Sequence, residues 1–276
     1  MNQTRTILVT GCSSGIGAHC ARALKGDGWR VFATARRPAD LEALENDGLE
    51  AFYLDYREPD SIAALTATVL ERTGGTLDAL FNNGAYSQAG AVEDLSTQAL
   101  REQFEANFFG WHELTRRIIP VMRAKGHGRI VQCSSILGLV PMRWRGAYNA
   151  SKFALEGLSV TLRMELAGSG IHVSLIEPGP IESKIAVNAL HYIEKNIDIE
   201  GSVHRRDYER ELQRMRQGGV KSKHKLGPDA VYQALRHALE NPDPKPHYVL
   251  TRPARIGTAL KRLLPARLLY RILEKR

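Results

Sequence analysis

A phenol and an ammonium group lie four residues apart in the segment Tyr148-Asn-Ala-Ser-Lys152. On a helix, side chains at this spacing share one face. The pKa of a free tyrosine is about 10, too high for effective proton transfer at neutral pH, and a neighbouring cation lowers it. Ser135 precedes Tyr148 by thirteen residues, at the end of a predicted strand, and its hydroxyl can polarise a carbonyl group. The three residues predict proton transfer at a carbonyl or alcohol oxygen, although a Tyr-x-x-x-Lys pentapeptide alone is common by chance.

A glycine-rich turn lies near the start of the chain, in Thr10-Gly-Cys-Ser-Ser-Gly-Ile-Gly17. It follows a predicted strand and precedes a predicted helix. Glycines at such a turn permit unusual backbone angles and let a pyrophosphate approach main-chain N–H groups at the helix N-terminus. Packing alone is the other explanation, which the position after the first strand of an α/β pattern disfavours. We therefore expect this loop to bind a dinucleotide through Gly11, Ser13, Ser14, Gly15, Ile16 and Gly17.

The second predicted strand ends in Ala33-Thr-Ala-Arg-Arg37, where a carboxylate would bind the ribose hydroxyls of NAD. No acid stands there, and two arginines follow the strand. Because guanidinium groups complement a 2′-phosphate, we expect NADP(H) as the cofactor, bound through Arg36 and Arg37. Solvated surface charge is the alternative for both arginines, and it has more weight for Arg37.

Strands and helices that alternate along the chain would bring these residues together. Seven short runs of β-branched or aromatic residues are each bounded by turn-forming residues, and the stretches between them carry helical spacing. The alternation predicts an α/β fold: a single Rossmann-type domain over residues 1–276, with a seven-stranded parallel sheet covered by helices on both faces. The strands are expected at residues 6–10, 30–34, 50–54, 77–82, 129–134, 171–176 and 247–251.

The alternation breaks at residues 181–227, which show polar helical stretches and no strand pattern. This insertion follows the carboxyl end of the sixth predicted strand. Ligands of open α/β sheets bind on that side, so we expect a helical substrate lid within the domain.

Composition argues against several other classes of protein. The 276 residues include 38 Lys and Arg, 30 Asp and Glu, and three cysteines, which excludes a disordered or collagen-like chain. The cysteines are too few and too scattered for a disulfide framework or a zinc site, so we expect no metal. No secretory pattern begins the sequence, and no apolar run approaches the ~20 residues of a membrane span. We therefore expect a cytoplasmic protein.

The net charge of +8 is unevenly distributed. Residues 201–227 carry +5 and residues 252–276 carry +7, which leaves the rest of the chain mildly acidic. That distribution argues against nucleic acid as a partner. The basic C-terminal tail, residues 252–276, has the leucine spacing of an amphipathic helix that Pro265 interrupts. Four arrangements stay open: packing on its own domain, peripheral contact with an anionic membrane, capture of an acidic or lipidic substrate, or contact with a partner subunit.

Taken together, the motifs resemble those of the short-chain dehydrogenase/reductase superfamily. Within it, the chain most resembles an NADP-preferring branch that includes 17β-hydroxysteroid dehydrogenases and bacterial aldehyde reductases. The order and spacing of the motifs are highly specific. They are Thr10–Gly17, Asp55, Asn82-Asn83, Asn107, Ser135, Tyr148–Lys152 and Pro178-Gly179.

The resemblance implies a role for each matching residue. Tyr148 would be the general acid in carbonyl reduction, and Lys152 would lower its pKa and hold the nicotinamide ribose. Ser135 would stabilise charge on the substrate oxygen, and Asn107 would hold a water in a proton relay through Lys152. Asp55, with Tyr56 beside it, would contact adenine, and Ile181 and Ser183 would meet the carboxamide. The full set of further cofactor contacts is Asp55, Tyr56, Asn83, Gly84, Pro178, Gly179, Ile181 and Ser183.

The sequence departs from the family pattern in two ways. Gly84 and Ala85 stand in the reverse of the usual order, and Ser183 replaces the usual threonine. Both changes keep a small residue or a hydroxyl, so we expect close approach of the cofactor to survive.

The expected function is NADP(H)-dependent interconversion of a carbonyl and an alcohol by hydride transfer. The expected substrates are apolar aldehydes or ketones, including steroid-like and retinoid-like molecules. Of the residues between Ser135 and Tyr148, Trp144 is expected to line the substrate pocket, with Tyr86 opposite. The predicted helices near 96–125 and 146–168 resemble those through which the family forms homodimers and homotetramers. The alternatives are a non-catalytic NADPH-binding regulator and a membrane-surface scaffold that uses the basic tail.

Overall fold

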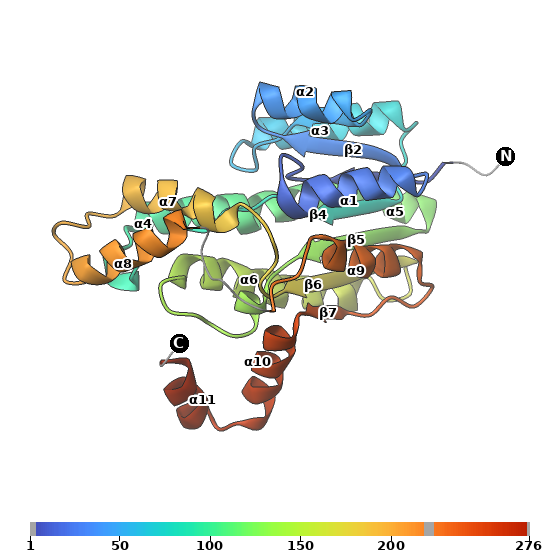
Figure 1. The fold of residues 1–276 in the computed structure, drawn as a ribbon. Helices are drawn as coiled ribbons and strands as arrows, with labels where there is room; N and C mark the ends of the chain where they lie inside the picture. The colour runs from blue at the N-terminus through green and yellow to red at the C-terminus, as the bar shows by residue number, and fades with distance from the viewer. Residues whose placement is uncertain (1–3, 218–223, 275–276) are drawn as a thin grey trace.

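Parallel strands form one twisted sheet across the protein (Figure 1). The computed structural model describes residues 4–217 and 224–274. Within them the sheet has seven strands in the order β3-β2-β1-β4-β5-β6-β7, each parallel to its neighbours, which confirms the predicted seven-stranded sheet. The strands are β1 (Thr6–Val9), β2 (Arg30–Ala35), β3 (Glu50–Tyr53), β4 (Ala79–Asn82), β5 (Gly128–Cys133), β6 (Ile171–Pro178) and β7 (His247–Leu250).

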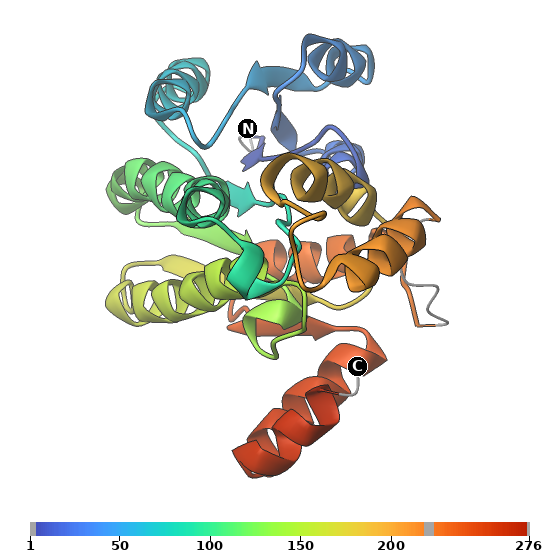
Figure 2. The same cartoon turned by 90° about the vertical axis from the view of Figure 1, so that its left-hand side faces the viewer.

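Helices connect successive strands and cover both faces of the sheet. On one face α1 packs against α9, and on the other α3 packs against α5; Figure 2 shows the layers nearly end-on. The helices are α1 (Gly15–Gly26), α2 (Pro38–Asn46), α3 (Pro59–Arg72), α4 (Thr97–Phe104), α5 (Gly110–Lys125), α6 (Gly146–Glu165), α7 (Ile185–Asn196), α8 (Arg205–Arg216), α9 (Asp229–Glu240), α10 (Arg252–Leu263) and α11 (Ala266–Leu273).

Three short helical turns interrupt this pattern: the 3₁₀ turns η1 (Val92–Asp94) and η3 (Ile136–Gly138), and the π-helical turn η2 (Glu105–Phe109). The π-helical turn lies between α4 and α5, within the stretch that the sequence predicts as one long helix. Such turns occur frequently at functional sites.

Successive strands are added on one side of β1 up to β3 and on its other side from β4 onward. The candidate site lies at this change of direction. Connections from β1 proceed through β2 to β3 on one side, whereas β4 lies on the other side of β1. The helices that follow β1 and β4 therefore lie on opposite faces of the sheet, and a crevice opens beyond the strand ends, as in other doubly wound sheets. Ile7, Leu8 and Val9 of β1 are fully buried, since helices cover both faces of the central strand.

The predicted lid contains α7 and α8, and a small apolar core joins it to Ala89 of the main domain. That core includes Ile193, Tyr208 and Met215. A single parallel bridge between Ile181 and Leu226 joins the two ends of the insertion, a feature that its polar sequence does not indicate. Residues 218–223, which the predicted insertion also includes, lie outside the described part of the chain.

The C-terminal tail forms two helices, α10 and α11, which break at Leu264 and Pro265. In Figure 1 they extend away from the sheet beyond β7. Among the described residues, no helix combines the length and apolar character needed to cross a membrane.

Candidate active site

A cleft of about 400 Å³ lies at the carboxyl ends of the strands. It brings together most of the residues that the sequence singles out, from six strand ends and from the lid. The predicted residues that line it are Gly11, Ser13, Ser14, Gly15, Ile16, Arg36, Asp55, Tyr56, Asn83, Gly84, Tyr86, Ser135, Tyr148, Lys152, Pro178, Gly179, Ile181 and Ser183. Gly17, Arg37, Asn107 and Trp144 do not line it.

The glycine loop forms one end of the cleft. Gly11 and Gly15 have φ angles of +69° and +58°, a region that side chains with a Cβ rarely adopt. A Cβ on Gly17 would lie 2.3 Å from the carbonyl oxygen of Gly11, so this glycine permits packing of α1 behind the loop. Ser14 begins α1 without capping it through its side chain. The first N–H groups of the helix are thus available to an anion, which fits a dinucleotide pyrophosphate.

The loops after β1 and β4 are bonded to each other. The Thr10 hydroxyl oxygen accepts hydrogen bonds from the backbone N–H groups of Asn83 and Gly84, at 2.8 and 3.2 Å. In return, Asn83 Nδ2 donates to the carbonyl oxygens of Thr10 and Gly11. Gly84 stands where the two backbones meet, since a Cβ on Gly11 would lie 2.4 Å from its Cα. The reversed Gly84-Ala85 order therefore keeps the small residue that this contact requires.

Acidic and basic side chains define the far end of the cleft. Arg36 follows β2 and lines the cleft, with Nη1 3.7 Å from Oδ2 of Asp55. Asp55 also pairs with Arg57 at 2.5 Å. Burial alone would raise the pKa of Asp55, but the hydrogen bonds and charge of Arg57, with the charge of Arg36, outweigh it and hold this pKa below its ordinary value. Asp55 is therefore ionised at neutral pH.

Arg37 has a different environment from its neighbour. It precedes α2, which begins at Pro38, and its guanidinium donates to both carboxylate oxygens of Asp40 at 2.7 and 2.8 Å. The structure thus corrects the prediction that both arginines face the cofactor. The turn into α2 directs Arg37 to an acid in the first turn of that helix, and only Arg36 reaches the cleft.

The groups predicted for proton transfer meet where β5 and α6 face the cleft. Tyr148 lies near the start of α6, buried, and forms a hydrogen bond with Ser135, which follows β5. Lys152 lies one turn further along α6. Its Nζ donates to the carbonyl oxygen of Cys133 at 2.9 Å and lies 5.8 Å from the centre of the Tyr148 ring. This arrangement can donate a proton to a substrate oxygen in the cleft.

The structure does not show the lowered pKa expected for Tyr148. Burial raises the pKa of the phenol above its ordinary value, and the hydrogen bond with Ser135 offsets only part of that rise. Burial also lowers the pKa of Lys152 to about 8. Desolvation therefore outweighs the attraction that the one-turn spacing suggests, because both groups lose contact with water.

Asn107 is fully buried in the π-helical turn η2, behind the cleft. Its Nδ2 donates to the carbonyl oxygen of Tyr86 at 2.9 Å, and its Oδ1 accepts from the Tyr86 N–H at 3.2 Å. Asn107 thus fixes the backbone of Tyr86, whose ring stacks on Tyr192 of the lid with 4.0 Å between centroids. This contact links the turn to the substrate side of the cleft.

Trp144 is not a pocket residue, contrary to the prediction. Its ring packs edge-on against Tyr208 and His204, at 5.1 and 5.2 Å between centroids, within the apolar core of the lid. The next residue, Arg145, lines the cleft instead and pairs with Glu211 of α8 at 2.9 Å. Trp144 has a φ of +63°, and this backbone conformation separates the directions of the two side chains.

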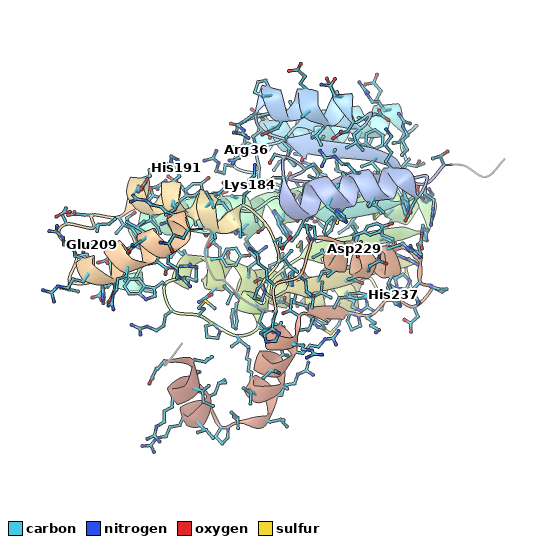
Figure 3. All side chains as sticks on the ribbon, viewed as in Figure 1. Arg36, Lys184, His191, Glu209, Asp229 and His237 are labelled. Atoms are coloured by element: carbon cyan, nitrogen blue, oxygen red, sulfur yellow. The ribbon has the colours of Figure 1, made fainter. Side chains whose placement is uncertain are left out.

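The lid supplies cleft residues that the sequence analysis missed. The first two turns of α7 contribute Ile185, Ala186, Asn188 and Ala189, and Lys184 lies directly before the helix. Figure 3 labels Lys184 and Arg36 at the cleft. The sequence indicated these residues only as part of the predicted lid, not one by one.

A family model described as short chain dehydrogenase matches residues 5–192. The chain belongs to the short-chain dehydrogenase family. Its sequence is 39% identical over 270 residues to YbbO, an uncharacterized oxidoreductase of Escherichia coli (strain K12), covering 98% of this chain and 94% of that protein. Human retinol dehydrogenase 8 is 37% identical over 64% of this chain and 59% of its own length. Human 17-beta-hydroxysteroid dehydrogenase type 1 is 34% identical over 70% of this chain and 61% of its own length.

Solved structures of family members share the fold. A short-chain dehydrogenase from Streptomyces avermitilis is 31% identical, covers 94% of this chain and 92% of its own, and has a TM-score of 0.78. A variant of actinorhodin polyketide ketoreductase with NADPH is 30% identical, with 86% and 91% coverage and a TM-score of 0.69. A Burkholderia phymatum family member in complex with NAD is 27% identical, with 95% and 92% coverage and a TM-score of 0.77. The protein is thus an oxidoreductase of a family that uses NAD(P).

Proposed function

We propose that this dehydrogenase is an NADP(H)-dependent enzyme that reduces apolar aldehydes or ketones to alcohols. The observation that carries the proposal is the Tyr148–Ser135 pair in the cleft, with Lys152 one turn along the same helix. Arg36 supports the choice of NADP(H), since it lines the cleft at the end of β2, where no acid stands.

The nicotinamide cofactor, when bound, supplies the hydride for carbonyl reduction. Ser135 and Tyr148 would both donate hydrogen bonds to the substrate oxygen, which orients it and stabilises the charge that develops there. The raised pKa of Tyr148 keeps its phenol protonated at neutral pH. Tyr148 therefore holds the proton that the new alcohol would require.

The cofactor end of the cleft fits a dinucleotide with a 2′-phosphate. The N-terminus of α1 and Ser14 would hold the pyrophosphate, and Asp55 would lie beside the adenine. The Arg36 guanidinium, half exposed and 3.7 Å from Asp55, would pair with the 2′-phosphate. Solved relatives include complexes with NADPH and with NAD, so the preference must be tested on this chain.

Apolar side chains contribute to the substrate end of the cleft. Ile181, Ile185 and Ala189 line it from the lid beside Lys184 and Asn188, and the Tyr86 ring lines the cleft as well. The apolar side chains would contact an apolar chain or ring system, and the few polar groups would orient it. Partial similarity to retinol dehydrogenase 8 and to 17-beta-hydroxysteroid dehydrogenase type 1 supports retinoid-like or steroid-like substrates.

A turnover screen tests this function. Purified protein would be assayed with NADPH or NADH against decanal, retinal, a ketosteroid and an oxoacid. We expect activity with NADPH on the apolar carbonyls, and a loss of at least about a hundredfold in Tyr148→Phe. Tyr53→Phe, at an exposed tyrosine outside the cleft, is the matched control.

Cofactor choice has its own matched pair of variants. Arg36→Ala should weaken NADPH binding and leave NADH binding unchanged, because only NADPH carries the 2′-phosphate. Arg37→Ala removes the same charge one residue away, outside the cleft. Equal effects of the two substitutions would contradict the assignment of Arg36.

A non-catalytic NADPH-binding regulator is the alternative function. It would bind NADPH but reduce no carbonyl in the screen, and Tyr148→Phe would then change nothing. The complete set of Asn107, Ser135, Tyr148 and Lys152 around the cleft favours the enzyme.

We also propose a homodimer or homotetramer formed through the surfaces of α4, η2, α5 and α6. Exposed apolar side chains gather there: Leu100, Phe109, Phe153, Val160 and Met164. Light scattering of wild type and of Phe109→Ser with Met164→Ser tests this contact, and an unchanged mass would contradict it.

A further inference from the structure

The two tail helices, α10 and α11, form an amphipathic arm that the fold of the sheet does not require. In Figures 1 and 2 the arm projects from the body beyond β7. Its main contacts are those of α10 with β7 and η3 and those of α11 with α10. Much of its surface is therefore open to an external partner.

Apolar side chains on this arm face solvent. Leu263 is 79% exposed, Ile256 56% and Leu268 47%, and the Tyr270 ring is 55% exposed. Ile256, Leu260 and Leu263 are spaced by four and three residues, so they share one face of α10. Leu268 and Ile272 are four residues apart, so they share one face of α11. The arm thus presents apolar side chains along both of its helices.

Cations surround these apolar side chains. The arm carries six exposed basic residues and one acidic residue, Glu274, in its described part: Arg252, Arg255, Lys261, Arg262, Arg267 and Arg271. None of these six basic residues forms a salt bridge with any residue that the structure describes. The lid helix α8 also carries five arginines but differs, because Arg205, Arg210 and Arg214 all pair with neighbouring carboxylates. The charge of the arm is therefore left uncompensated by the protein itself.

We propose that the α10–α11 arm docks the protein on an anionic lipid surface. Apolar side chains would enter the interface between head groups and acyl chains, and the arginines and lysine would pair with anionic head groups. A second copy of the chain is a poorer occupant. A two-fold contact through this face would place the same cations opposite each other, with no acid in the arm other than Glu274 to balance them.

The arm leaves the sheet at the edge where the cleft opens. In a parallel sheet all carboxyl ends lie at one edge, and α10 begins directly after the carboxyl end of β7. α10 then packs on the turn that follows Ser135: Lys261 Nζ donates to the carbonyl oxygen of Leu139, and a Cβ on Gly257 would lie 4.0 Å from Ile136. Docking would therefore hold the cleft on the membrane side of the protein, which suits the apolar substrates of the proposed function.

Vesicle sedimentation of the full chain tests the docking surface. The protein would be mixed with phosphatidylcholine vesicles that contain or lack phosphatidylserine. We expect sedimentation only with phosphatidylserine, and its decrease as salt rises. Arg267→Gln with Arg271→Gln should lower the vesicle partition coefficient about 25-fold, at about fivefold for each cation near the surface. The control variant, Arg206→Gln with Lys245→Gln, removes the same charge at exposed positions outside the arm. It should change the vesicle partition coefficient little.

Three results would overturn the proposal: no sedimentation of wild type, equal sedimentation with both vesicles, or equal losses in the arm and control variants. Leu263→Ser with Leu268→Ser separates lipid from protein contact. We expect it to lower vesicle binding and to leave the mass in light scattering unchanged. A smaller mass instead would identify the arm as a contact between copies and would refute lipid docking. The assay needs no cofactor or substrate, so its outcome is independent of the oxidoreductase proposal.

Discussion

Replacement of Glu156 by glutamine should remove much of the pH dependence of stability between pH 5 and pH 8. Glu156 lies on α6, one turn beyond Lys152, and is buried. Fully buried Glu177 and partly exposed His247 accompany it, with His247 Nδ1 3.8 Å from Glu156 Oε2 and 2.5 Å from Glu177 Oε1. Burial first, and then the negative charge of Glu177, raises the pKa of Glu156 to about 7.

The size and sign of the effect follow from that pKa. An ordinary glutamate in the unfolded chain has a pKa of 4.5, so it loses its proton well before folded Glu156 does. Between these values the folded state binds more protons, and stability must fall as pH rises from about 4.5 to 7. At 1.36 kcal/mol per pKa unit, the loss is about 3 kcal/mol. His247 changes stability in the same direction, because its hydrogen bond to Glu177 raises its pKa above 6.5.

Equilibrium urea unfolding at a series of pH values from 5 to 8 measures the difference between wild type and Glu156→Gln. The free energies of unfolding should be similar near pH 5, and the variant should be more stable by about 3 kcal/mol at pH 8. His247 and Glu177 are present in both proteins, so the part of their contribution that does not depend on Glu156 cancels in the difference. Glu165→Gln, at an exposed position on the same helix, is the control and should behave like wild type. A difference that stays constant with pH, or a variant that is less stable at pH 8, would refute the reasoning.

Three further substitutions test the site. Gly17→Ala should lower stability by about 1–3 kcal/mol and weaken NADPH binding in thermal-shift assays, because its Cβ would lie 2.3 Å from a carbonyl oxygen; Gly26→Ala, with open space at the Cβ, should do neither. Ser135→Ala should lower kcat about a hundredfold with unchanged NADPH affinity, since it removes a donor to the substrate oxygen; a loss of affinity instead would make Ser135 a cofactor residue. Trp144→Ala should speed proteolysis of the lid, because the ring packs in the apolar core that joins the lid to the domain; an unchanged rate of lid cleavage would contradict that role.

Local patterns were enough to predict the fold and much of the site. The seven strands appear within a few residues of their expected positions, because buried parallel strands are continuous apolar runs between turn residues. The glycine loop and the Tyr148–Lys152 pair also follow from local spacing. Such features depend on backbone conformation over a few residues, which the sequence specifies directly.

Other features depended on contacts between distant segments. The position of Asn107 in a π-helical turn and its bonds to Tyr86 join residues 21 apart. The cleft residues on α7 depend on how the lid folds back over the sheet. The periodic patterns of the sequence do not predict these contacts.

By itself, the sequence determined the parallel sheet, the glycine loop and the identities of the groups proposed for proton transfer. Only the tertiary structure decided which of Arg36 and Arg37 faces the cleft, why Arg145 rather than Trp144 lines it, and that burial raises the pKa of Tyr148. Residue type and spacing define what chemistry a chain can perform. The direction of a side chain and its access to water, which set its partners and its pKa, arise only when distant segments pack together.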